Sequence, residues 1–133
     1  MVYQEGQLSG SADFRVGINI WHNGTHNALN ISTYGWEVRL TTPQQYGTYD
    51  SQSTQSWSAN IGGNHRSGTF KLTYENRYNN NVIVASGYVD ITHDADGYRP
   101  SFASTASIST NHGSVGSGTS PQAWIDGLRI PKA

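Results

Sequence analysis

Hydrophobic and polar residues alternate along most of this chain. In the segment SADFRVGINIWHNG, residues 11–24, every second position from 12 to 20 is apolar, and the positions between are polar or glycine. A period of two puts neighbouring side chains on opposite faces of an extended strand, so one face of this segment should lie against a core. The apolar positions are Ala12, Phe14, Val16, Ile18 and Ile20.

Three further segments show the same alternation. Residues 31–40, 56–61 and 102–108 are therefore predicted strands. A short apolar segment, residues 123–131, is predicted to close the domain. The positions expected to face inward are Tyr34, Trp36, Val38 and Leu40; Trp57, Ala59 and Ile61; Phe102, Ser104, Ala106 and Ile108; and, at the end, Trp124, Leu128 and Ile130.

The stretches between these strands are rich in Asn, Gly, Gln and Ser. These residues favour turns and loops because they tolerate unusual backbone angles or bond to their own backbone. Residues 22–30 and 42–55 are therefore predicted as loops, residues 62–68 as a turn, and residues 111–122 as a Gly/Ser loop.

Residues 69–92 are predicted to form one long hairpin that turns at YNNN, residues 78–81. On the descending strand two sets of residues compete for the inward face, so the register stays open. One set is Ile83, Ala85, Gly87, Val89 and Ile91, and the other contains Val82, Val84 and Tyr88.

Strands at intervals of about ten residues, separated by turn residues, are typical of antiparallel sandwiches and barrels. No segment shows helical spacing. We predict an all-β protein in which residues 1–133 form a single antiparallel β-sandwich domain of jelly-roll or Ig-like type, with about seven to nine strands.

The composition of the chain argues against several classes of function. Only 13% of the residues are charged and the net charge is −1, whereas a nucleic-acid-binding protein shows a clustered basic face. The absence of cysteine excludes disulfides, thiolate zinc sites and cysteine nucleophiles. No apolar run approaches the ~20 residues that span a membrane, so membrane insertion is not expected.

The motif HDADG superficially resembles a calcium-binding loop. An EF-hand loop needs oxygen ligands at its first, third and fifth positions, glycine at the sixth and glutamate at the twelfth. Counted from Asp94, the fifth position is Tyr98, the twelfth is Thr105, and the glycine comes too early. We therefore interpret the motif as a turn without metal or catalytic role, formed by His93, Asp94, Asp96 and Gly97.

No catalytic constellation stands out. His22 and His26 are four residues apart, but they lie in a predicted loop, where that spacing does not bring ligands together. A glycosidase needs two placed carboxylates, and only a pairing of the mid-strand residues Glu37 and Glu75 stays open. We expect no enzymatic activity and no cofactor.

Five aromatic residues lie out of phase with the core pattern or in predicted loops: Trp21, Tyr46, Tyr49, Tyr78 and Tyr98. Flat aromatic rings beside Asn and Gln suit sugars, which stack on the rings and hydrogen-bond through their hydroxyls. The alternative is that these rings pack over the ends of the sandwich. The candidate saccharide-binding residues are Trp21, Tyr46, Tyr49 and Tyr78, and we hypothesise that they line one open groove.

The second half of the chain carries a recognisable order of motifs. A strand leads into I-x-H-[DN]-x-D-G, and an alternating strand, a Gly/Ser loop and a terminal strand ending in I-P-[RK]-A follow. The matching residues are Ile91, His93, Asp94, Asp96 and Gly97, and then Ile130, Pro131, Lys132 and Ala133. From about residue 60 to residue 133 the chain resembles a β-sandwich domain of tail-associated structural proteins of long-tailed bacteriophages.

The resemblance implies a non-enzymatic structural module of the virion tail, assembled in the host cytoplasm. It is either a small virion protein or a module of a larger tail protein. The implied partners are other tail proteins, further copies of the chain and a cell-wall polysaccharide on the host. The alternative is a carbohydrate-binding module of a polysaccharide-degrading enzyme, which fits the same composition.

Overall fold

The structure, a computed structural model, describes the backbone of residues 1–77 and 79–129, and their side chains except at 46–49 and 74–77. The described residues form eleven strands and one 3-10 turn, η1 (Asn27–Leu29). The strands are β1 (Val2–Gln7), β2 (Arg15–His26), β3 (Ile31–Thr42), β4 (Tyr46–Ile61), β5 (Asn64–Arg77), β6 (Asn80–Thr92), β7 (Tyr98–Arg99), β8 (Phe102–Ser109), β9 (Ser117–Thr119), β10 (Ala123–Ile125) and β11 (Leu128–Arg129).

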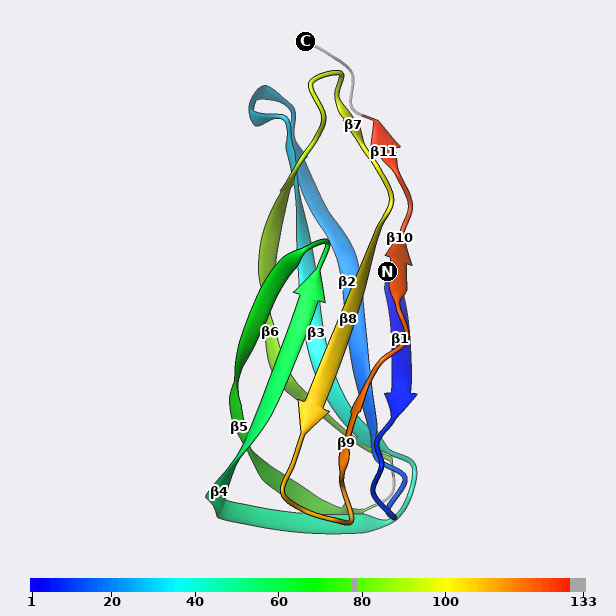
Figure 1. The fold of residues 1–133 in the computed structure, drawn as a ribbon, viewed down its shortest axis with the longest axis vertical. Helices are drawn as coiled ribbons and strands as arrows, with labels where there is room; N and C mark the ends of the chain where they lie inside the picture. Colours follow the sequence, from blue (N-terminus) through cyan, green and yellow to red (C-terminus); the bar gives the residue numbers. More distant parts are fainter. Residues whose placement is uncertain (78, 130–133) are drawn as a thin grey trace.

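Two antiparallel sheets pack face to face along the long axis of the molecule (Figure 1). One has the order β1-β2-β3-β6, and the other has the order β10-β8-β4-β5 with β9 also pairing with β8. A third, small sheet pairs β7 with β11. The predicted antiparallel β-sandwich is confirmed. The strand number exceeds the expected seven to nine because β7, β9, β10 and β11 are two or three residues long, too short to show alternation.

The core lies between the inner faces of the two sheets. In β2 and β3 the predicted inward residues are fully or almost fully buried. The opposite sheet contributes Ala59, Ile61, Leu72, Ala106 and Ile108. Alternation therefore predicts the core correctly wherever a strand has one face on the other sheet.

The predicted hairpin over residues 69–92 is wrong. β5 pairs with β4, β6 pairs with β3, and the chain crosses from one sheet to the other between them. The predicted loop over residues 42–55 belongs largely to β4, which gives β5 a long partner. The turn that joins β4 to β5 is formed by Gly62 and Gly63, whose φ angles of +58° and +92° favour glycine, so it is shorter than predicted.

Each of the two competing sets of β6 residues faces inward over part of the strand, because a β-bulge changes the phase of the side chains. Ala85 pairs with Val38 and Ile83 pairs with Arg39, so Val84 is the extra residue. Val82 packs against the core on one side of the bulge and Val89 on the other. Ile83 and Tyr88 point outward and are 47% and 63% exposed.

Two other predicted segments differ from the structure. The loop over residues 22–30 is mostly strand, because β2 continues to His26 through a bulge, and only η1 and Asn30 turn the chain. The terminal apolar segment forms two short strands instead of one. In β10 the inward residue is Ala123, whereas Trp124 is 54% exposed. Ile130 lies outside the described residues.

Candidate functional site

Of the predicted saccharide-binding residues, only Trp21 has a described side chain. Tyr78 lies outside the described residues. Tyr46 and Tyr49 lie on β4, with their backbones opposite Arg77 and Thr73, and their side chains are not described. Trp21 is a half-buried residue of β2.

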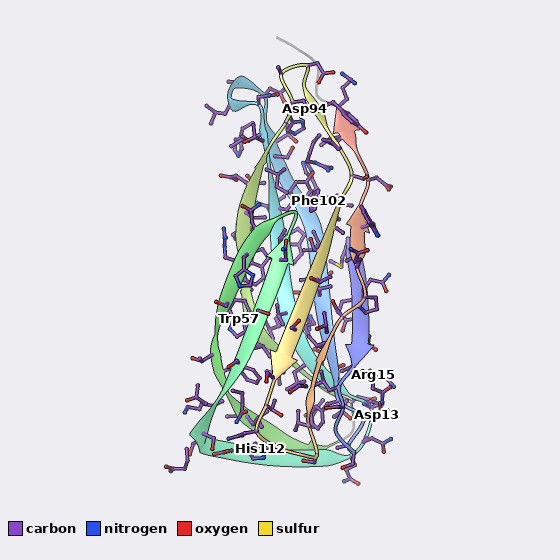
Figure 2. All side chains as sticks on the ribbon, in the orientation of Figure 1. Asp13, Arg15, Trp57, Asp94, Phe102 and His112 are labelled. Carbon is purple, nitrogen blue, oxygen red and sulfur yellow. The ribbon has the colours of Figure 1, made fainter. Side chains whose placement is uncertain are left out.

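The backbone of Trp21 lies far from the start of β4. Arg15 pairs with Thr41 near the end of β3, and β4 follows just after that end (Figures 1 and 2). Along β2, Arg15 and Trp21 are about 20 Å apart at the usual rise per residue. Trp21 is therefore too far from the start of β4 to share a local groove with the residues there.

Trp21 instead lines a groove at one edge of the sandwich, which we call the edge groove. It forms where β1 stops covering β2, since Val2 pairs with Ile20, and where the chain leaves β10 to enter β11. In Figure 1 the N-terminus lies beside β10 at this edge. The volume of about 310 Å³ is at the lower end of the range for small-molecule sites. Its principal side chains are Trp21, His22, Tyr34, Arg99, Trp124 and Asp126.

Two tryptophans are among the residues that line the edge groove. A Cβ atom on Gly35, which is opposite Trp21 in β3, would lie 2.3 Å from Cε2 of the Trp21 indole. The indole therefore lies directly on the glycine backbone, on the outward face of its sheet. Trp124 stands opposite the small residue Ala103 and exposes about half of its surface. The two indoles thus lie on the outward faces of the two sheets, beside the edge where the groove forms.

Arg99 forms part of the floor and is only 2% exposed. Its guanidinium carbon lies 5.0 Å from the ring centroid of Tyr34 and 4.9 Å from that of Phe102, which stabilises the cation by cation–π attraction. Nη1 donates to the carbonyl of Pro100 and Nη2 to that of Asp126, both at 2.6 Å. Among the described residues, Nε has no hydrogen-bond partner and no carboxylate forms an ion pair with Arg99.

Tyr34 lies beside Arg99 and is fully buried. Its hydroxyl is closed off from solvent, and the polar side chains beside it are Arg99 and Ser32. Burial raises the pKa of this hydroxyl, and the charge of Arg99 opposes part of the rise. The ring of His22 packs edge-on against Tyr34 with 5.3 Å between ring centroids. Nε of Arg99 and the Tyr34 hydroxyl are therefore buried beneath the surface of the groove.

A larger hollow of about 540 Å³ lies on the outer face of the sheet that contains β1, β2 and β3. Its charges compensate one another. Arg15 pairs with Glu5 at 3.2 Å and with Asp13 at 3.1 Å, and Arg39 pairs with Glu37 at 3.1 Å. Because each charge already has a partner, this surface offers a ligand less than the edge groove does.

Tyr3 lies in the same hollow and donates its hydroxyl to Glu5 at 2.9 Å. Burial, with help from Glu5, raises the pKa of Tyr3 to about 12. A Cβ atom on Gly17 would lie 2.2 Å from the Tyr3 hydroxyl oxygen, so this ring covers the backbone of β2. Tyr3 therefore packs onto the sheet and pairs within the protein.

The backbones of Glu37 and Glu75 belong to different sheets. Glu37 lies on the outer face of its sheet, where Arg39 and Asn19 bond to its carboxylate. Glu75 belongs to β5, in the opposite sheet. Because the Glu37 side chain is on the outer face of its sheet, it points away from the sheet that contains Glu75.

The HDADG motif forms the corner between β6 and β7, at the end of the molecule where Figure 2 labels Asp94. The N–H of Gly97 bonds to the carbonyl of Asp94 at 2.8 Å, and Gly97 has a φ of +86°, which favours glycine. The Asp96 carboxylate accepts the N–H of Tyr98 and pairs with Arg129 at 3.2 Å. These contacts hold the pKa of Asp96 below its usual value.

His93 is buried and links this corner to β3 by hydrogen bonds. Its Nδ1 lies 2.9 Å from the carbonyl of Gly97, so Nδ1 carries the proton and donates. Its Nε2 then accepts the Ser32 hydroxyl at 2.6 Å. Asn30 donates its side-chain amide to the carbonyls of His93 and Asp94. Both nitrogens of His93 are thus used structurally.

No protein family, curated protein or solved structure matches the chain. Within the described part of the chain, no three His, Cys, Asp or Glu side chains gather as a metal ion would require. No helix among these residues has the length and apolar character to span a membrane.

Arg99, Tyr34 and Trp124 are the groove residues that the sequence did not indicate. Tyr34 is in phase with the core, and Trp124 was assigned to it by its apolar neighbours.

Proposed function

We propose that this chain is a non-enzymatic module of a bacteriophage tail, and that its edge groove binds a saccharide on the host surface. The observation that carries the binding function is the presence of two tryptophans, Trp21 and Trp124, among the residues that line one open groove. Sugar rings stack on such side chains, and polar groups of the site orient them.

The assignment to a virion tail rests on the resemblance of residues 60–133. The HDADG corner is compatible with it, because its residues bond within the fold and leave the edge groove free for recognition. The expected partners are other tail proteins and the host polysaccharide. A carbohydrate-binding module of a polysaccharide-degrading enzyme would use the same groove, and the order of motifs favours the tail.

A weak site is sufficient for this function. The edge groove is small and open, so it holds only a short stretch of polymer. When one of several copies on a virion has bound, the other copies are held close to the polymer and bind at a high effective concentration. The avidity then exceeds the affinity of one site by a factor of about 10² to 10⁴.

The test is binding of the whole chain to bacterial cell walls and to a polysaccharide array, as a monomer and displayed multivalently. Trp124→Ala should abolish binding without unfolding the protein, because Trp124 is largely exposed. Tyr88→Ala is the matched control: Tyr88 is 63% exposed on β6, away from the groove. Absence of binding even in the multivalent format, or equal loss with both variants, would contradict the proposal.

A further inference from the structure

Three Asn-Gly or Asp-Gly pairs occur in the chain, at residues 23–24, 96–97 and 126–127. In such a pair the backbone nitrogen of the glycine can attack the side-chain carbonyl carbon of the preceding residue, because glycine has no Cβ atom to obstruct the approach. A succinimide ring forms if the side chain and the peptide group between the two residues can rotate. The structure constrains the three pairs to different degrees.

Asn23 lies at the β-bulge near the end of β2. His22 pairs with Tyr34 and Gly24 pairs with Thr33, so Asn23 has no partner in β3. Its side chain is exposed and forms no hydrogen bond among the described residues. A Cβ atom on Gly24 would meet nothing within 4 Å, so no neighbouring atom crowds the glycine. This pair has both an accessible side chain and an uncrowded backbone.

The Asp96–Gly97 pair is held by hydrogen bonds. The N–H of Gly97 donates to the carbonyl of Asp94 at 2.8 Å. The Asp96 carboxylate accepts the N–H of Tyr98 at 3.2 Å and pairs with Arg129 at 3.2 Å. Both groups that would join in the ring are therefore engaged elsewhere, and the fold should protect this pair.

The Asp126–Gly127 pair has an exposed carboxylate but a restricted backbone. The carbonyl of Asp126 accepts Nη2 of Arg99 at 2.6 Å. A Cβ atom on Gly127 would lie 2.5 Å from the hydroxyl oxygen of Tyr98, so that side chain covers the glycine. The peptide group that would have to rotate is thus restricted by a hydrogen bond and by a close side chain.

Ring closure at Asn23 requires the residue to leave the extended conformation of β2. Such local opening costs least where a strand has few buried contacts. None of residues 22–30 is buried, and the connection from β2 to β3 lies at one end of the molecule (Figure 1). The bulge adds to this, because Asn23 has no register partner to lose.

We propose that Asn23 is a self-modification site, which converts to aspartate and isoaspartate in the folded chain. The Gly24 nitrogen loses its proton to solvent base and bonds to Cγ of Asn23. The bond from Cγ to Nδ2 then breaks, and ammonia leaves with a proton from solvent. Water hydrolyses either carbonyl–nitrogen bond of the succinimide, which gives aspartate or isoaspartate without any enzyme, oxidant or reductant.

The modification changes the surroundings of the edge groove. His22, the residue before Asn23, is one of its lining residues. Either product adds one negative charge to a chain whose net charge is −1, so ion exchange separates modified from unmodified protein. Isoaspartate also inserts one carbon into the backbone of β2. The reaction itself does not depend on the proposed saccharide binding.

The test is incubation of the folded chain at physiological temperature, at neutral and at mildly alkaline pH. Peptide mapping by mass spectrometry locates each amide that becomes an acid, and isoaspartyl methyltransferase labels isoaspartate. We expect Asn23 to convert about tenfold faster than any other asparagine, a difference of about 1.4 kcal/mol in the barrier. The rate should rise with pH, because the attacking nitrogen must lose its proton.

Gly24→Ala is the matched variant, because its methyl group meets nothing in the fold but obstructs ring closure. It should stay folded by circular dichroism and lower the rate at Asn23 about tenfold. Equal rates in the two chains, or earlier conversion of another asparagine, would overturn the proposal.

The chain unfolded in urea is the second comparison. Asp96 and Asp126 should form isoaspartate much faster there than in the folded chain, whereas Asn23 should react in both. If Asn23 converts only in urea, β2 protects it and the proposal is wrong. Isoaspartate at Asp96 in the folded chain would contradict the protection that its hydrogen bonds are expected to give.

Discussion

The indole of Trp21 lies on Gly35, the residue directly opposite it in the neighbouring strand. Two other tryptophans repeat this relationship across other strand pairs. Trp36 lies on Gly87, and Trp57 lies on Gly68. Glycine weakens a strand interior by itself, but here it provides room for a large ring and thereby fixes the register of each pair.

Substitution of these glycines should destabilise the protein in a definite order. Gly87→Ala should cost about 1–3 kcal/mol, because Trp36 is buried and has nowhere to move. Gly35→Ala should cost about 1 kcal/mol or less, because the half-buried Trp21 ring swings outward and loses only a cross-strand contact. Urea unfolding of each variant measures the difference.

Gly24→Ala is the control for this series. Gly24 also lies on β2, and a Cβ atom there meets nothing within 4 Å. Its stability should stay within about 0.5 kcal/mol of the unmodified chain. A larger loss for Gly24→Ala than for Gly87→Ala would contradict the proposed role of these contacts.

Alternation predicted which face of a strand is buried, but not which strand lies next to it. It identified Phe14 to Ile20 and Tyr34 to Leu40 because each set has a continuous inward face. It failed at residues 69–92, where β5 and β6 resemble a hairpin but pair with β4 and β3. The bulge at Val84 explains why two registers fitted the sequence equally well.

The edge groove could not be predicted from alternation either, because alternation does not show which strands are neighbours. Tyr34 and Arg99 are far apart in sequence and meet only because β3 and β7 approach one another at the same edge. The sequence indicated Trp21 as a candidate binding residue because it falls between the alternating positions that face the core. The neighbours of Trp21 depend on the order of strands, which the alternation does not contain.

His93 should be required for stability and not for binding. His93→Leu leaves the Ser32 hydroxyl and the Gly97 carbonyl without their buried partner, which should cost about 2–4 kcal/mol. Chemical denaturation measures the loss. His65→Leu is the matched control, because His65 is exposed, and should change stability by less than about 0.5 kcal/mol. Equal effects of the two substitutions would show that the corner is not held by His93.

Acid should destabilise the protein partly through Asp50. Its carboxylate accepts the N–H groups of Ser53 and Gln52 at 2.9 Å and lies 2.7 Å from Nε2 of His112. The Ser53 N–H first, and His112 next, hold the pKa of Asp50 well below its ordinary value of 3.8. Because the folded-state pKa is the lower one, this contribution is present above pH 3.8 and is lost as the pH falls below it.

Asp50→Asn should therefore reduce the acid dependence of stability. The measurement is the urea midpoint from neutral pH to below the ordinary carboxyl pKa. The variant should be less stable near neutrality and converge with the unmodified chain in acid. Asp90→Asn, an exposed carboxylate on β6, serves as the control. A constant difference between Asp50→Asn and the unmodified chain at every pH would contradict this explanation.

The central claim is that a saccharide binds in the edge groove between Trp21 and Trp124. The most direct measurement is a titration of the ¹⁵N-labelled chain with a cell-wall polysaccharide, followed through the four indole N–H signals. We predict that the signals of Trp21 and Trp124 shift together and saturate, while those of Trp36 and Trp57 stay in place. Shifts at Trp57 without shifts at Trp21 and Trp124, or no shift with a polymer that binds the chain, would contradict the claim.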